Sequence, residues 1–234
     1  ATGLALDTSD FASIHEFVNE VNRFACSIEM LAHNAGALTD KYQTDDRGME
    51  LTLSSHLVGP YLLTRLLTPR FTTGARVVYM SSGGMYTQGL DVARIEMSER
   101  SYRGAVAYAR AKRGQVEMVK HLGSKLAPDL ILHAMHPGWV DTPGVDAGLP
   151  GFGKVMGPLL RDAEQGADTM VWLASGAAAD AETTTNAKAM IPAEGKARIY
   201  VMRHGFVGGQ QGMNITIDDT LNSQIRSKYF LMAE

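Results

Sequence analysis

A hydroxyl, a phenol and an amine are spaced in this sequence so that all three can act on one proton. Ser82 follows the apolar run RVVYM at 76–80, and Tyr108 and Lys112 lie four residues apart further along the chain. Residues i and i+4 share one face of a helix, so Tyr108 and Lys112 can point into the same pocket. A free phenol has a pKa of about 10, and a neighbouring ammonium lowers that pKa and makes the phenol a usable general acid/base. We therefore predict that Ser82 holds a substrate oxygen while Tyr108, made more acidic by Lys112, exchanges a proton with it.

The alternative, a solvent-exposed Tyr and Lys on an ordinary helix, is weakened by two further motifs. The chain reads LAHNAG at 31–36 and HPGWVDT at 136–142. Taken in order, the three motifs resemble the short-chain dehydrogenase/reductase family, whose pattern is Asn-Asn-Ala-Gly, then Ser, then Tyr-x-x-x-Lys, then Pro-Gly-x-Val-x-Thr. The resemblance covers residues 1 to about 175 of the chain.

This resemblance implies a nicotinamide dinucleotide, NADP or NAD, as cofactor and a small-molecule alcohol or carbonyl compound as substrate. It implies that Tyr108 passes the proton, that Lys112 also binds the nicotinamide ribose, and that Ser82 bonds the substrate oxygen. Asp7 matches the acidic residue that contacts the adenine ring. The remaining cofactor positions lie along the dinucleotide or at the nicotinamide amide, and they are Asn34, Ala35, Gly36, Pro137, Gly138, Val140 and Thr142.

Two histidines depart from the family pattern. His33 takes the place of the first Asn, a ribose contact, and His56 takes the place of an Asn that holds a water between the lysine and solvent. Because histidine titrates near neutrality, His56 is either part of a proton relay or a packed helix residue. Asp7 likewise is either the adenine contact or a residue that starts the helix after it.

The order of apolar and polar residues predicts alternating strands and helices. We expect strands near 1–6, 28–32, 75–80, 131–136 and 198–202, and helices near 14–24, 49–67, 108–126 and 162–174. Such alternation predicts an α/β fold of the Rossmann type, a doubly wound parallel sheet with helices on both faces. Pro60 removes a backbone donor from the second of these helices and should bend it.

The beginning of the family pattern has no counterpart in this sequence. The family opens with a strand and a Gly-rich turn, Thr-Gly-x-x-x-Gly-x-Gly, that brings the cofactor pyrophosphate to a helix N-terminus. No such turn precedes Asp7, and the glycines near 151–157 follow Pro150 rather than a strand. Two strand-helix units, about 60 residues, are therefore expected to be absent, which predicts an unpaired apolar sheet edge and weak dinucleotide binding. A second hypothesis stays open, a truncated, non-catalytic remnant that acts at most as a binding partner.

Composition narrows the class further. The chain has 234 residues, 45% of them hydrophobic, which suits a single domain over 1–234. A net charge of −3 without a basic run argues against nucleic acid as a partner. No apolar run reaches the length of a membrane span, and the lone Cys26 suits a reducing compartment such as the cytoplasm. We find no spacing of His, Cys or acidic residues that predicts a metal site.

Three stretches outside the motifs carry weaker predictions. Residues 144–160 are rich in Gly and Pro and are expected to form a loop on the substrate side, while 177–234 form a variable C-terminal segment. Residues 83–103 form an insertion similar to that of retinol-dehydrogenase-like members, several of which act on lipophilic substrates. Small residues would let a second helix approach the helix of Tyr108 and favour a homo-oligomer, and they are Ala105, Ala107, Ala109 and Ala111.

Overall fold

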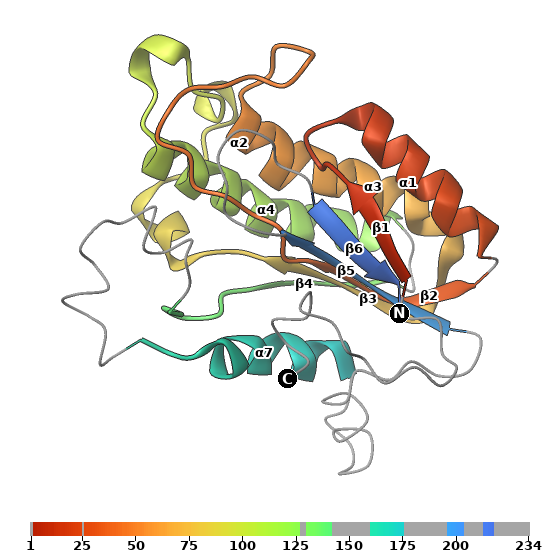
Figure 1. The fold of residues 1–234 in the computed structure, drawn as a ribbon. Coiled ribbons are helices and arrows are strands. Elements are labelled where there is room, and N and C mark those ends of the chain that lie inside the picture. The colour runs from red at the N-terminus through yellow and green to blue at the C-terminus, as the bar shows by residue number, and fades with distance from the viewer. Residues whose placement is uncertain are drawn as a thin grey trace.

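The computed structural model describes residues 2–24, 26–126, 130–141, 160–175, 196–203 and 213–217. Strands and helices alternate along the first four of these ranges, as predicted from the sequence (Figure 1). The strands are β1 (Thr2–Leu6), β2 (Ser27–His33), β3 (Phe71–Met80), β4 (Ile131–Met135), β5 (Lys196–Arg203) and β6 (Met213–Ile217). The helices are α1 (Phe11–Arg23), α2 (Leu51–Leu53), α3 (Gly59–Leu67), α4 (Gly104–Leu126) and α7 (Ala163–Ser175).

The strands form one sheet in the order β1-β6-β5-β2-β3-β4. Strands β5, β2, β3 and β4 run parallel to one another, whereas β6 is antiparallel to both of its neighbours. Helices α1, α3 and α4 lie on one face of the sheet and α7 lies on the other (Figure 1). The Rossmann-type arrangement predicted from the sequence is confirmed, with one antiparallel strand added to it.

The expected unpaired edge beside β2 is not present. Strand β5 pairs along β2 from Ser27 opposite Lys196 to His33 opposite Val201. Strand β6 pairs along β1 in the same way, from Thr2 opposite Ile217 to Leu6 opposite Met213. The prediction was wrong because strands from the C-terminal segment occupy the two places between β1 and β2. Backbone donors and acceptors are the same in every strand, so pairing does not depend on which end of the chain supplies the partner.

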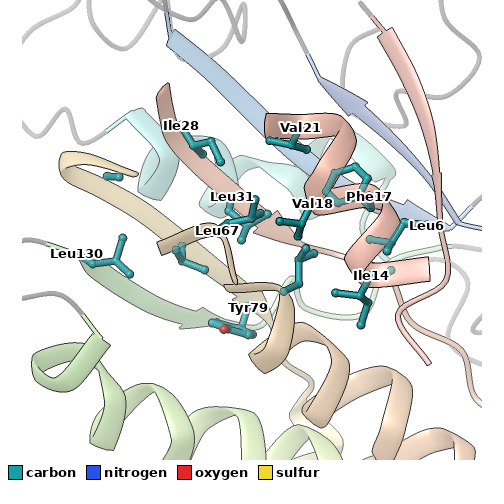
Figure 2. Close-up of a cluster of buried hydrophobic side chains, with 14 of the residues drawn as sticks. Leu6, Ile14, Phe17, Val18, Val21, Ile28, Leu31, Leu67, Tyr79 and Leu130 are labelled. Atoms are coloured by element: carbon teal, nitrogen blue, oxygen red, sulfur yellow. The ribbon is translucent and has the colours of Figure 1, made fainter. Parts of the chain in front are cut away.

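The larger apolar core lies between the sheet and helices α1 and α3. Apolar residues on α1 recur at spacings of three and four, which places them on the face that Figure 2 shows turned toward β2 and β3. The buried members of this core in α1 are Ile14, Phe17, Val18 and Val21, and the sheet contributes Leu6, Ile28, Leu31, Val77 and Tyr79. A smaller core joins α7 to the opposite face through Met30, Val78 and Met170. This packing fixes the helices relative to the ends of the strands.

The helix expected over 49–67 forms, but it contains a π-helical turn at Ser54–Val58. Pro60 has no N–H, so the carbonyls of Ser55 and His56, five and four residues before it, lack a helical donor. Both carbonyls accept from side chains instead: Thr8 Oγ1 donates to Ser55 O at 3.0 Å, and Gln115 Nε2 donates to His56 O at 2.5 Å. The donor that Pro60 lacks thus falls next to a π-helical turn, the expected bend stays a prediction, and the two carbonyls tie this turn to Thr8, after β1, and to α4.

Gly59, within the same turn, lies against the backbone that follows β1. A Cβ atom added at Gly59 would lie 1.7 Å from the carbonyl oxygen of Thr8. We expect Gly59→Ala to lower the free energy of unfolding by about 1–3 kcal/mol, since the helix must move away from Thr8. Urea denaturation measures this change. Gly89→Ala is the matched control, because its Cβ would meet nothing within 4 Å, and equal stabilities for the two variants would contradict the close packing.

The small residues of α4 pack mostly against other elements of the same chain. Ala107, Ala109 and Ala111 are all buried, whereas Ala105 is exposed. The argument that they would admit a helix from a second copy is therefore wrong for these three positions, because this chain's own elements already cover them. No helix in the described ranges has both the length and the apolar composition to cross a membrane.

Candidate active site

The residues predicted to act together follow three neighbouring parallel strands. Asn34 is the first residue after β2, whereas Ser82 is the second residue after β3 and Pro137 the second after β4. The carboxyl ends of adjacent parallel strands meet at one edge of a sheet, which is where open α/β sheets bind ligands. Helix α4 passes this edge and contributes Tyr108 and Lys112.

The structure brings Ser82, Tyr108 and Lys112 together. The Tyr108 phenol lies close enough to Ser82 for a hydrogen bond with that side chain to lower the pKa of the phenol, and Ser82 Oγ accepts from the N–H of Gly84 at 3.2 Å. Lys112 Nζ lies 5.4 Å from the centre of the Tyr108 ring and donates to Met80 O at 2.6 Å. Met80, the last residue of β3, therefore holds the amine, and the phenol lies beside Ser82, two residues later.

Burial governs the ionisation of this site. It raises the pKa of Tyr108, and only the hydrogen bond from Ser82 opposes the rise. Burial also lowers the pKa of Lys112 from 10.5 to about 7. The prediction that Lys112 makes Tyr108 more acidic is wrong for this structure, since the amine is directed at a carbonyl and is itself easily deprotonated. At neutral pH Tyr108 is a protonated phenol.

His56 lies in the π-helical turn, with its ring 5.3 Å from that of Tyr108 in an edge-on arrangement. Its Nε2 accepts from the backbone N–H of Ala37 at 3.0 Å, and its Nδ1 lies 2.9 Å from Thr52 O. This pattern requires the tautomer that carries the proton on Nδ1, which donates to Thr52 O. Of the two roles left open for His56, the geometry favours the packed residue, because the Nε2 lone pair already holds the Asn34–Ala37 segment.

Gly36 lies where a side chain would obstruct the site. A Cβ atom at this position would be 3.0 Å from His56 Nε2 and 3.9 Å from Lys112 Nζ. The absence of a side chain thus lets the backbone at Gly36 approach His56 and the amine of Lys112 closely. That residues 34–36 lie along the cofactor stays a prediction.

The Pro137–Val140 segment is held by a residue that the sequence did not single out. Arg161 donates from its backbone N–H to Trp139 O at 2.8 Å and from Nη1 to Pro137 O at 3.1 Å. At the start of the segment, Nδ1 of His136 accepts from the N–H of Gly83 at 3.1 Å, beside Ser82. No pattern in the sequence marks Arg161, because its partners are backbone carbonyls 22 and 24 residues earlier. Thr142 and most of the predicted 144–160 loop lie outside the described residues.

Asp7 is not brought into contact with the other candidates. Strand β1 points the same way as β2 but lies three places from it in the sheet, which is about 14 Å at ordinary strand spacing. The Asp7 carboxylate accepts from the N–H and the hydroxyl of Ser9, at 2.8 and 2.7 Å. The cap of α1 is Asp10, which accepts from the N–H of Ala12. Asp7 therefore shapes the turn, at a distance suited to the far end of a long ligand.

His33, which takes the place of the first Asn of the family motif, is buried. Its Nε2 lies 2.8 Å from Thr64 Oγ1, and its ring stacks on Tyr79 with the centres 4.5 Å apart. Thr64 donates to Pro60 O, so its oxygen accepts from His33 and from the Tyr79 hydroxyl. Nδ1 of His33 has no hydrogen-bond partner among the described residues. Burial, together with the charge of Lys112, lowers the pKa of His33 from 6.5 to about 3.

The insertion at 83–103 packs on the elements that surround the site. It contains 3-10 turns at Gly83–Thr87, Val92–Arg94 and Glu99–Ser101. Glu96 accepts from the backbone N–H of Glu50 at 3.0 Å, and Arg110 of α4 donates to Arg94 O at 2.6 Å. The large apolar side chains that it leaves exposed are Tyr86, Leu90 and Val92.

A sheet whose parallel strands end beside a Ser-Tyr-Lys group defines a Rossmann-type protein with the side chains of a dehydrogenase. Comparison with known proteins identifies the family. Residues 1–186 match the family model described as enoyl-(acyl carrier protein) reductase. The chain belongs to the short-chain dehydrogenase/reductase family, as the three motifs predicted.

The relatives support the branch as well as the family. Human dehydrogenase/reductase SDR family member 12 is 36% identical over 179 residues, which cover 76% of this chain and 56% of that protein. Mouse retinol dehydrogenase 11 is 27% identical over 138 residues, 58% of this chain and 43% of that protein. The chain thus spans about half the length of the curated relatives it matches.

Solved structures show the same fold. A short-chain dehydrogenase/reductase from Serratia marcescens is 19% identical with a TM-score of 0.55, covering 84% of this chain and 73% of that one. A short-chain dehydrogenase from Burkholderia cenocepacia, solved in complex with NADP, is 18% identical with a TM-score of 0.54 and covers 72% of this chain and 67% of that one.

Proposed function

We propose that the protein is an oxidoreductase dependent on NADP or NAD that interconverts an alcohol and a carbonyl compound. The observation that carries this proposal is the position of Tyr108 beside Ser82 and the buried amine of Lys112, at the carboxyl ends of parallel strands. A substrate oxygen bound between the two hydroxyls would accept from both. Membership of the short-chain dehydrogenase/reductase family supports the same reaction class.

In the direction of carbonyl reduction, Tyr108 is the proton donor. Because burial keeps its phenol protonated at neutral pH, Tyr108 can give its proton to the oxygen as negative charge develops there. Ser82 donates a second hydrogen bond to that oxygen and fixes its position. Lys112, with a pKa of about 7, gains or loses a proton readily and can return one to Tyr108.

The residues at this edge fit the nicotinamide half of a dinucleotide. A protonated Lys112 has three N–H groups, and Met80 O takes one, which leaves two for ribose hydroxyls. Gly36 brings the backbone close to that amine, and Pro137, Gly138 and Val140 form the segment that would receive the nicotinamide amide. The bound dinucleotide supplies the hydride, and the protein orients it and moves the proton. Asp7 would contact the adenine end.

For the substrate we propose a lipophilic carbonyl compound. The insertion at 83–103 packs beside the site and exposes Tyr86, Leu90 and Val92. Such side chains favour contact with an apolar molecule over a strongly charged one. The likeness of the insertion to that of retinol-dehydrogenase-like proteins points the same way.

A carbonyl panel tests the proposal. Purified protein would be mixed with NADPH or NADH and with aliphatic, aromatic and terpenoid aldehydes and ketones, and the loss of reduced nicotinamide followed by absorbance. We expect turnover with at least one dinucleotide and faster reduction of the apolar compounds than of sugars or keto acids. No turnover with either dinucleotide would instead support the non-catalytic alternative.

A further inference from the structure

We propose that Arg161 is a positioning residue that holds the Pro137–Val140 segment in the conformation that receives the nicotinamide amide. Its backbone makes two hydrogen bonds to the segment, donating to Trp139 O at 2.8 Å and accepting from the N–H of Asp141 at 2.9 Å. These bonds form a parallel bridge between Val140 and Arg161. They do not depend on the type of side chain at 161, so they keep position 161 beside the segment in any variant of that residue.

The side chain of Arg161 adds a specific fit. Its Nη1 donates to Pro137 O at 3.1 Å, and its stem lies against the Cα of Gly138. Gly138 has a φ of +85°, and a Cβ atom there would be 2.8 Å from Cδ of Arg161. Glycine meets both conditions, since it adopts this φ without strain and leaves room for the arginine. The arginine thus covers the one face of Gly138 that a side chain would otherwise occupy.

A second contact holds the start of the segment. Nδ1 of His136 accepts from the N–H of Gly83 at 3.1 Å, and burial, with a smaller effect of the Arg161 charge, lowers the pKa of that imidazole. The segment is therefore fixed at His136 to the residue after Ser82 and at Pro137 to Arg161. Loss of the arginine side chain should loosen the nicotinamide side of the site while Ser82 and Tyr108 stay in place. This inference rests on the proposed function for its nicotinamide part.

The first test reads the segment without any dinucleotide. The chain contains two tryptophans, so Trp172→Phe leaves Trp139 as a single reporter within the segment. In that background we expect Arg161→Ala to lower the fluorescence anisotropy of Trp139 and to increase its quenching by acrylamide. Arg161→Lys, which keeps a donor for Pro137 O, should restore most of both. Arg100→Ala, at an exposed arginine outside the segment, is the matched control and should change neither.

The second test links the segment to the cofactor. For a lost hydrogen bond we expect Arg161→Ala to raise the KM for the reduced dinucleotide about five- to tenfold, with kcat changed about twofold or less. Unchanged Trp139 fluorescence in Arg161→Ala would overturn the positioning role, whether or not the protein turns over. A mobile Trp139 with an unchanged KM would overturn its link to the nicotinamide. If the wild-type chain shows no turnover, the proposed function fails, and the fluorescence alone decides whether Arg161 holds the segment.

Discussion

Replacing Tyr108 by phenylalanine should lower the rate of carbonyl reduction by about two to four orders of magnitude, the usual contribution of a positioned general acid. The phenol lies beside Ser82, and burial keeps it protonated. Phenylalanine retains the ring that packs against His56 but has no proton to give. The neighbouring Lys112 cannot replace it, because its amine is directed at Met80 O.

The matched control for this variant is Tyr61→Phe, which removes a hydroxyl from a partly exposed side chain of α3. We expect Tyr61→Phe to retain wild-type turnover and Tyr108→Phe to retain dinucleotide affinity, measured by fluorescence titration of the reduced nicotinamide. Initial rates with the best carbonyl compound of the panel give the comparison. A Tyr108→Phe variant within about threefold of the wild-type rate, well below the smallest expected effect, would show that the proton comes from another group.

Acid should unfold the protein through His33. Its pKa is lowered from 6.5 to about 3 by burial and by Lys112, so between these values the unfolded chain binds a proton that the folded chain does not. The contribution of neutral His33 to the free energy of unfolding is therefore complete above pH 6.5, and it is lost as the pH falls toward 3. From the shift in pKa, the loss due to His33 is about 2–3 kcal/mol between pH 7 and about pH 4.5, and about 5 kcal/mol in all.

Urea denaturation at several pH values checks this dependence on His33. His33→Asn places a side chain that does not titrate at the same position, and its free energy of unfolding should fall less steeply with decreasing pH than that of the wild type. His15→Asn, at an exposed histidine of α1, should keep the wild-type slope. Parallel curves for His33→Asn and the wild type would contradict the assignment of acid sensitivity to His33. The slope is compared rather than the absolute stability, since Asn also changes the contacts to Thr64 and Tyr79.

The parts of the fold that depend on local pattern were predictable from the sequence. Apolar spacing located α1, and the i, i+4 relation placed Tyr108 and Lys112 on one side of α4. Since β2, β3 and β4 are parallel neighbours, the residues that follow them had to meet at one edge, and Asn34, Ser82 and Pro137 do so. These predictions succeeded because each followed from residues close together in sequence or from the rule that places the ends of parallel strands.

Features set by distant partners were not predictable. The pattern at 198–202 predicted a strand but not its place beside β2, since an apolar strand pairs equally well with several edges. The raised pKa of Tyr108 depends on the depth at which α4 is buried, which helical spacing does not determine. Arg161 acts through backbone carbonyls. Every residue type has a backbone carbonyl, so the sequence does not identify these partners. The geometry favours packing for His56 only because the structure shows the partners of both of its ring nitrogens.

The most direct test of the proposed site follows the hydride and the proton in one reaction. Protein would be incubated with reduced dinucleotide that carries deuterium at both C4 positions of the nicotinamide and with the best ketone of the panel, and the product alcohol analysed by mass spectrometry. We predict that the wild-type product carries a single deuterium on the carbinol carbon and that Tyr108→Phe forms almost none of it. Product alcohol without deuterium, or equal yields of deuterated alcohol from wild type and Tyr108→Phe, would contradict hydride transfer assisted by the Tyr108 proton.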